Sequence, residues 1–192
     1  MKKTILALSG ALALSGCFGG AKVPDTLMTL NAAQMRPAAT PRTAAEGQAI
    51  TVAVPTVPRE LQTLRVPVHE SELAVSYLKN AQWIEMPATL FARVVSETIG
   101  ATTGRVVLDP KQFSFDPGQR LTGTLQRFGY DAAGGQAVAV YDAVLARQGG
   151  GVTTQRFEAR VPAATADAAG VSAALNQAAN QIAADVARWV AR

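Results

Sequence analysis

The stretch RLTGTLQRFGYDAAGGQAVAVYDAVLARQGGGVTTQRFEARVP, residues Arg120–Pro162, decides the fold of this chain. It contains three segments rich in apolar and β-branched residues, near 119–130, 136–147 and 152–161. Two glycine-rich connections separate them. Short connections of this kind between such segments are typical of β-hairpins. The stretch therefore predicts a meander of three antiparallel strands that ends at Pro162.

Shorter strands are predicted upstream of the meander. The β-branched run 49–54 predicts one strand and 72–78 predicts a second, with a loop at 66–68 between them. Residues 105–108 predict a further short strand, which ends at an Asp-Pro pair.

Two helices are predicted from apolar periodicity. Pro87 suits the first turn of the first helix, and Gly100 is its expected C-cap. The second helix, 167–190, has an apolar stripe on one side. Mostly polar residues lie opposite the stripe: Asn176, Gln177, Asn180, Gln181 and Asp185. The sequence thus predicts a single α+β domain at 49–192, with a mixed, largely antiparallel sheet and two helices packed on it.

The segment before this domain, 17–48, is rich in Ala, Pro, Gly and Thr. Such a composition buries too little apolar surface to order itself, so it predicts a flexible tether. The short apolar interruption TLMTL, 26–30, predicts an edge strand that docks on the domain.

The only cysteine, Cys17, follows a typical export signal. Lys2 and Lys3 precede the apolar run 5–14, which is typical of a secretory signal peptide and shorter than the about 20 residues of a membrane span. The LSGC ending at 14–17 resembles the lipobox of bacterial lipoproteins. This resemblance implies cleavage between Gly16 and Cys17, removal of residues 1–16, and attachment of lipid, traceable with labelled palmitate, at Cys17. An incidental cysteine at the end of an ordinary signal peptide is the alternative.

The residue after the lipidated cysteine contributes to sorting in bacterial lipoproteins. Asp at that position commonly favours retention in the inner membrane, and this chain has Phe18 there. The resemblance therefore implies attachment to the outer membrane, at its periplasmic face, through the N-terminal lipid.

Charge argues against a nucleic-acid partner. The formal net charge is +4, and two of the positive charges, Lys2 and Lys3, fall within the predicted signal peptide. No run of five basic residues exists, so the basic patch of a nucleic-acid-binding protein is missing.

The residues also argue against an enzyme. His69, the only histidine, falls on the predicted loop beside Glu70 and Glu72, where a solvated role is favoured over a catalytic one. With one histidine and one cysteine, a transition-metal site would depend on carboxylates alone, so we predict no metal. The aspartates are expected at strand ends, where Asp favours turns: Asp109, Asp116, Asp131 and Asp142. We predict a binding or assembly protein without catalytic residues or cofactors.

A further set of segments matches a family pattern. Val52-Ala53-Val54-Pro55 is followed by Val57-Pro58-Arg59-Glu60-Leu61, and then by Tyr77-Leu78-Lys79-Asn80-Ala81-Gln82-Trp83-Ile84-Glu85-Met86-Pro87 with its N-x-x-W motif. In order and spacing, and together with the lipobox, these segments resemble the ABC-type transport auxiliary lipoproteins, the PqiC/YmbA-like group, over nearly the whole mature chain. One departure is Leu27-Met28-Thr29-Leu30, which lacks the tyrosine often present in the first strand of the family.

This resemblance implies a non-catalytic accessory of lipid transport across the bacterial envelope, which works with ABC transporters and with MCE-domain proteins. A carrier with a lipid in its own cavity and a periplasmic hydrolase are the alternatives. Trp83 is either a core anchor at the corner between strand and helix or a contact for a partner. Trp189 is expected in the core. The sequence leaves open the transported lipid and whether the chain forms homo-oligomers.

Overall fold

The central strand of the sheet is β5 (Gly118–Asp131), which pairs along its whole length with β6 (Gln136–Arg147). In turn, β6 pairs with β7 (Val152–Pro162), and both pairings are antiparallel. The computed structural model describes residues 24–35, 41–109 and 118–192. It confirms the predicted meander, and the two glycine-rich turns lie where the sequence placed them.

Two shorter strands share the other edge of β5 and run parallel to it. One is β1 (Ala49–Val52), which pairs with the start of β5, and the other is β2 (Arg65–Ser71), which pairs with its end. The sheet is completed by β3 (Ala74–Gln82), antiparallel to β2, and by β4 (Val107–Leu108), parallel to β1. The result is the predicted mixed, largely antiparallel sheet, with seven strands.

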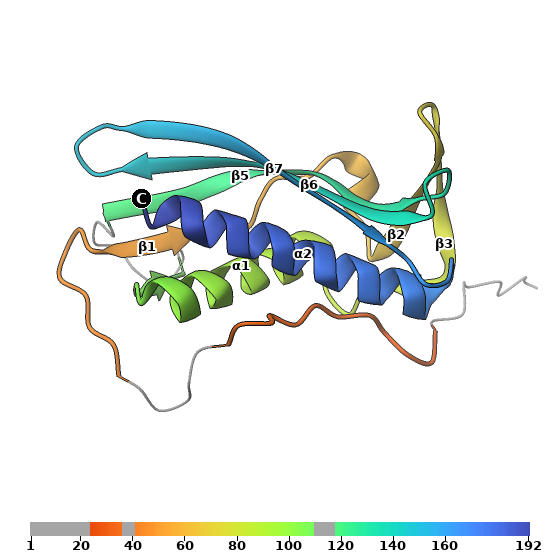
Figure 1. Cartoon of the computed structure of the whole chain (residues 1–192), viewed down its shortest axis with the longest axis horizontal. Coiled ribbons are helices and arrows are strands. Elements are labelled where there is room, and N and C mark those ends of the chain that lie inside the picture. Colours follow the sequence, from red (N-terminus) through yellow and green to blue (C-terminus); the bar gives the residue numbers. More distant parts are fainter. Residues whose placement is uncertain (1–23, 36–40, 110–117) are drawn as a thin grey trace, which may run out of the picture.

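Both helices, α1 (Pro87–Thr103) and α2 (Ala168–Val190), cover the same face of this sheet (Figure 1). Asp167 caps α2, because its carboxylate accepts a hydrogen bond of 2.9 Å from the backbone N–H of Gly170. Phe91 of α1 meets Tyr141 of β6 edge to face at 5.2 Å between ring centroids. The core therefore lies between one sheet face and the helical layer, as predicted for an α+β domain. Among the described residues, no helix is long and apolar enough to cross a membrane.

The predicted loop at 66–68 is wrong, because these residues lie within β2. Pro67 suggested a loop because proline has no N–H to donate to a sheet. In the structure a β-bulge between Arg65 and Pro67 interrupts the ladder, and bulges are among the places where strands tolerate proline. β3 also extends to Gln82, beyond the predicted end at 78.

The predicted end of α1 at Gly100 is also wrong. The helix continues to Thr103 and closes at Gly104, whose φ of 70° is the left-handed conformation typical of a helix C-cap. Gly100 is buried within the helix, and its carbonyl accepts a hydrogen bond from the guanidinium of Arg42.

Residues 24–35, which fall within the predicted tether, include a stretch that packs on the domain. The predicted strand at 26–30 is reduced to one parallel bridge, in which Met28 donates to Gln82 O at 2.8 Å and accepts from Ile84 N at 2.9 Å. Met28 and Leu30 are buried. This part of the chain runs along the helical layer (Figure 1) and is part of the folded domain.

Candidate functional site

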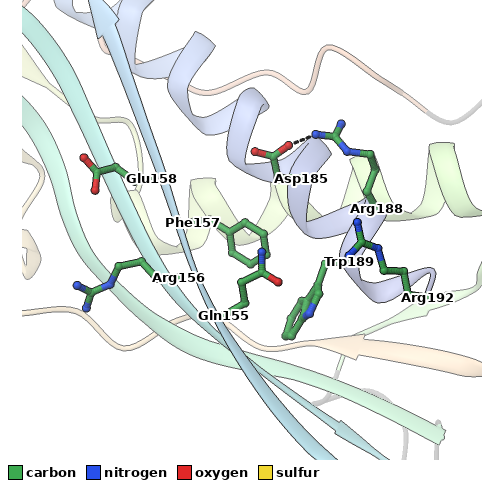
Figure 2. Close-up of a pocket in the computed structure, with 8 residues that line it drawn as sticks. All are labelled: Gln155, Arg156, Phe157, Glu158, Asp185, Arg188, Trp189 and Arg192. Atoms are coloured by element: carbon green, nitrogen blue, oxygen red, sulfur yellow. Dashed lines mark hydrogen bonds and ion pairs between the residues drawn. The ribbon is translucent and has the colours of Figure 1, made fainter.

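A groove of about 380 Å³ opens between β7 and the last turns of α2 (Figure 2). Among the described strands β7 pairs only with β6, so the groove lies at an edge of the sheet. Both elements contribute side chains to it, in a set of eight: Gln155, Arg156, Phe157, Glu158, Asp185, Arg188, Trp189 and Arg192.

Two aromatic rings form the apolar part of the groove. Phe157 is buried, and its ring lies 5.7 Å from that of Trp189 at an interplanar angle of 65°, an edge-to-face contact. Trp189 is only half-buried, so the prediction of a core position holds for one part of its indole and the rest is exposed in the groove. Partly exposed Trp beside Arg is a composition enriched at protein contact sites.

The charges of the groove are largely paired. Arg188 forms an ion pair with Asp185 along α2. Arg156 is directed away from Trp189 (Figure 2) and binds both oxygens of Asp142 on β6, at 2.6 and 2.7 Å. This hydrogen bonding lowers the pKa of Asp142 and raises that of Arg156. Within the described residues, Arg192 has no ion-pair partner, so it is the cation best placed to meet an acidic group of a ligand.

The groove offers aromatic and charged side chains that can bind a ligand or a partner. The lining residues include no histidine, cysteine or serine, and the carboxylate of Asp185 is already paired. In the part of the chain that the structure describes, no group of three or more His, Cys, Asp or Glu side chains could hold a metal ion.

A second groove, of about 690 Å³, lies between α1 and the edge formed by β1 and β4. Its lining includes more apolar side chains, among them Val52, Val54, Val107 and Leu108, and Val54 is 51% exposed. Its lining also includes Arg93, Glu97 and Asp109, so the groove suits a ligand that has both apolar and polar parts, such as a phospholipid.

Trp83 lies in the core. Its side chain has no exposed surface, its ring stacks on Phe128 at 5.7 Å, and its N–H on the backbone donates to Leu64 O at 2.7 Å. Of the two interpretations drawn from the sequence, this geometry favours the core anchor, because a partner has no access to the indole.

His69 and Asp142 differ from their predicted surroundings. His69 lies on β2 and is largely buried, with Nε2 at 3.4 Å from a carboxylate oxygen of Glu60. Burial, followed by the charge of Arg127, lowers the pKa of His69 and favours its neutral form. Asp142 lies in the middle of β6 and is no turn residue, whereas Asp131 does end β5.

The residues predicted to carry the lipid anchor, Gly16, Cys17 and Phe18, lie outside the described residues. Asp116 does too. Cleavage, lipid attachment and sorting therefore stay predictions.

The family model described as ABC-type transport auxiliary lipoprotein component matches residues 29–187. Among solved structures, protein XCC0632 from Xanthomonas campestris, of the family model DUF330, is similar with a TM-score of 0.70 at 20% identity, over 86% of this chain and 95% of that one. A second structure, described as an uncharacterized protein, has a TM-score of 0.68 at 16% identity, over 86% and 99%. At these identities the likeness concerns the fold. No curated protein matches significantly.

Proposed function

The chain belongs to the ABC-type transport auxiliary lipoprotein family, and we propose that it is a lipid-anchored, non-catalytic accessory of an ABC/MCE-type lipid transport system in the bacterial envelope. The observation that carries the proposal is the family match over residues 29–187, directly downstream of the LSGC motif at 14–17.

The proposed anchor is the lipid on Cys17, exposed by cleavage after Gly16. A single acyl chain binds membranes only marginally, so the two modifications of a bacterial lipoprotein, on the thiol and on the new amine, give stable attachment. Phe18 supports attachment to the outer membrane, at its periplasmic face.

The proposed contact for an MCE-domain or ABC transporter protein is the groove of Figure 2. Trp189 offers an exposed edge next to Arg188 and Arg192, and Trp and Arg are the residues that most often dominate binding energy at protein interfaces. The neighbouring ion pairs hold the surroundings of the indole in place.

Site-specific crosslinking in intact cells tests this function. A photoreactive residue in place of Arg192 should form an adduct with an MCE-domain or ABC transporter protein. The same residue in place of Gln177, which is exposed elsewhere on α2, is the matched control and should form less of it. Adducts with no transport protein from either position would contradict the proposal.

Lipid carriage is the alternative function, and the groove between α1 and the edge formed by β1 and β4 is the observation that favours it. The Cys17→Ala chain, which has no covalent lipid, would then co-purify with bound lipid. A Ser96→Phe substitution, at a half-exposed position that lines the groove, would reduce the amount of bound lipid, and circular dichroism would check that the variant is folded.

A further inference from the structure

The N-terminal segment binds the domain far from Ala49, the residue at which the predicted flexible tether would join it. Met28 bonds to the strand end at Gln82, and Leu30 is buried in the core. Beyond Met28, side chains of α2 bind the backbone: Asn31 N donates to Asn176 Oδ1 at 2.8 Å, and Ala33 N donates to Asn180 Oδ1 at 2.6 Å. The segment therefore has a fixed place along α2.

The first described residues lie at one end of the domain, which we call the near end. A groove of about 520 Å³ is lined there by Thr26 and Leu27 together with Ala168 and Ala169 at the start of α2. The loop before α2 also meets the turn between β5 and β6, since Ala163 N donates to Gly135 O at 3.0 Å. Figure 1 shows the start of the described chain, the start of α2 and this turn at the same end of the long axis.

The opposite end, which we call the far end, holds the turn between β6 and β7, the start of β1 and the end of α2. Gln148 N donates to Gly118 O at 2.7 Å, and Gly118 pairs with Ala49 of β1. The groove of Figure 2 is on this side, at Trp189. α2 has 23 residues, so at 1.5 Å per residue about 34 Å separates its two ends.

We propose that the lipidated protein presents the near end to the membrane and holds the far end, with the groove of Figure 2, away from it. This inference rests on the proposed lipid attachment at Cys17. Seven peptide units join Cys17 to Pro24, and even fully extended they span at most about 25 Å. If the chain up to residue 48 were instead a free tether, the domain would be joined to the membrane anchor at Ala49, on the far end.

The near end combines small uncharged residues with carboxylates. The turn between β5 and β6 includes Ala132, Ala133 and Gly134, and the loop before α2 includes Ala163–Ala166. Asp25, Asp131 and Asp167 flank these segments, so the described residues of this end offer no basic surface to anionic headgroups, and the domain depends on the covalent anchor to stay at the membrane.

Energy transfer to a labelled membrane tests the orientation on the whole lipidated chain. Because Cys17 is the only cysteine and carries the lipid, an introduced cysteine is a unique attachment point for a donor dye. Ala133→Cys labels the near end and Gln148→Cys labels the far end, and both residues are exposed. The vesicles contain phosphatidylethanolamine and phosphatidylglycerol with an acceptor dye on a trace of headgroups.

We expect higher transfer efficiency from Ala133→Cys than from Gln148→Cys, because the far end is about 30 Å further along the domain. A flexible Gly/Ser insert of about 20 residues between Val23 and Pro24, which adds roughly 25 Å of mean reach, should lower the near-end signal. Vesicle-bound protein with equal transfer from both positions, or with more from Gln148→Cys, would overturn the orientation alone. Protein that does not float with the vesicles would overturn the anchor, and the orientation with it.

Discussion

Asn180 binds the backbone of Asn31 across 149 positions of sequence: its Nδ2 donates to the carbonyl of Asn31 at 2.9 Å. Its Oδ1 accepts from the next-but-one residue, Ala33, at 2.6 Å. An extended segment normally satisfies its backbone N–H and C=O groups by pairing with a neighbouring strand. Here the side-chain amide of Asn180 provides those hydrogen bonds instead. The alternation of buried Met28 and Leu30 with exposed Thr29 and Asn31 shows that this segment is extended.

The double variant Asn176→Ala/Asn180→Ala should release this segment. Each hydrogen bond contributes about 0.5–1.5 kcal/mol net, so the loss of these bonds should raise the opening population roughly tenfold or more. Amide hydrogen exchange at Asn31 and Ala33 measures this directly, and both should exchange faster.

The matched control is Gln177→Ala/Gln181→Ala, one position further along the same helix, where both side chains are exposed. It should leave exchange at Asn31 and Ala33 unchanged. Equal acceleration by both double variants would mean that general loosening of α2, and not the loss of the asparagine contacts, releases the segment.

A second prediction concerns the packing of β2 on β5 at Gly129. A Cβ at this position would lie 2.5 Å from the carbonyl oxygen of Pro67. Gly129→Ala should therefore force the two strands apart and lower the free energy of unfolding by about 1–3 kcal/mol. Gly151, which also has an ordinary φ, would place its Cβ in open space, so Gly151→Ala should be nearly neutral. Chemical denaturation of both variants tests this prediction. An unchanged free energy of unfolding for Gly129→Ala would show that β2 can shift without cost.

A third prediction follows from the ion pair between Asp142 and Arg156. The hydrogen bond from Arg156 lowers the pKa of Asp142 in the folded state below its ordinary value of 3.8. A carboxylate with a depressed folded pKa contributes stability that is present above the unfolded value and is lost as the pH falls through the folded value. The stability difference between wild type and Asp142→Asn should thus be constant above about pH 5 and shrink progressively below it.

The Arg156→Gln background is the control for this pH dependence. There the comparison is between the single variant Arg156→Gln and the double variant Arg156→Gln/Asp142→Asn. With the guanidinium absent, the stability difference between these two proteins should lose most of its dependence on pH. Denaturation midpoints measured between about pH 2 and pH 7 provide the comparison. An undiminished pH dependence in the Arg156→Gln background would show that the ion pair is not its source.

The sequence predicts the local features of this fold better than the contacts between distant segments. The meander was predictable because its glycine-rich turns and β-branched strands are neighbours in sequence. The strand around Pro67 was not, because the bulge that accommodates the proline depends on pairing with β3. Similarly, Gly100 looks like a helix end, and only the burial of α1 against α2 shows that the helix continues past it.

The candidate groove was only partly predictable for the same reason. Helical periodicity places Trp189 on the apolar side of α2. Its indole is half-exposed because it lies beside β7, where the sheet ends, and a periodic pattern does not indicate which strand forms that edge. The polar stripe with Asn176 and Asn180 suggested a solvent-facing surface, because nothing in a periodic pattern indicates that a segment 145 positions away uses these side chains. The anchor at Cys17, in contrast, is predicted from a short continuous motif and needs no tertiary information.

The two tryptophans give the fourth prediction, on stability. Trp83 is fully buried and stacks on Phe128, so Trp83→Ala should lower the free energy of unfolding by about 3–5 kcal/mol. Trp189 loses only part of its surface to the core, so Trp189→Ala should cost roughly 1–2 kcal/mol, mainly through its contact with Phe157. Thermal and chemical denaturation of the Cys17→Ala chain rank the two variants, and equal costs would contradict the burial difference.

The fifth prediction, on partner binding, reverses this ranking. If the groove of Figure 2 contacts a transport protein, Trp189→Ala should weaken binding by about 2 kcal/mol or more, roughly thirtyfold, because a Trp flanked by Arg is a typical dominant contact. Trp83→Phe keeps an aromatic ring in the core and should leave affinity unchanged, since no partner reaches that position. Affinity is measured on folded protein at a temperature well below both melting transitions, by pulldown titration from solubilised envelope. Loss of affinity in Trp83→Phe with none in Trp189→Ala would place the contact elsewhere on the domain and remove the groove from the proposed function.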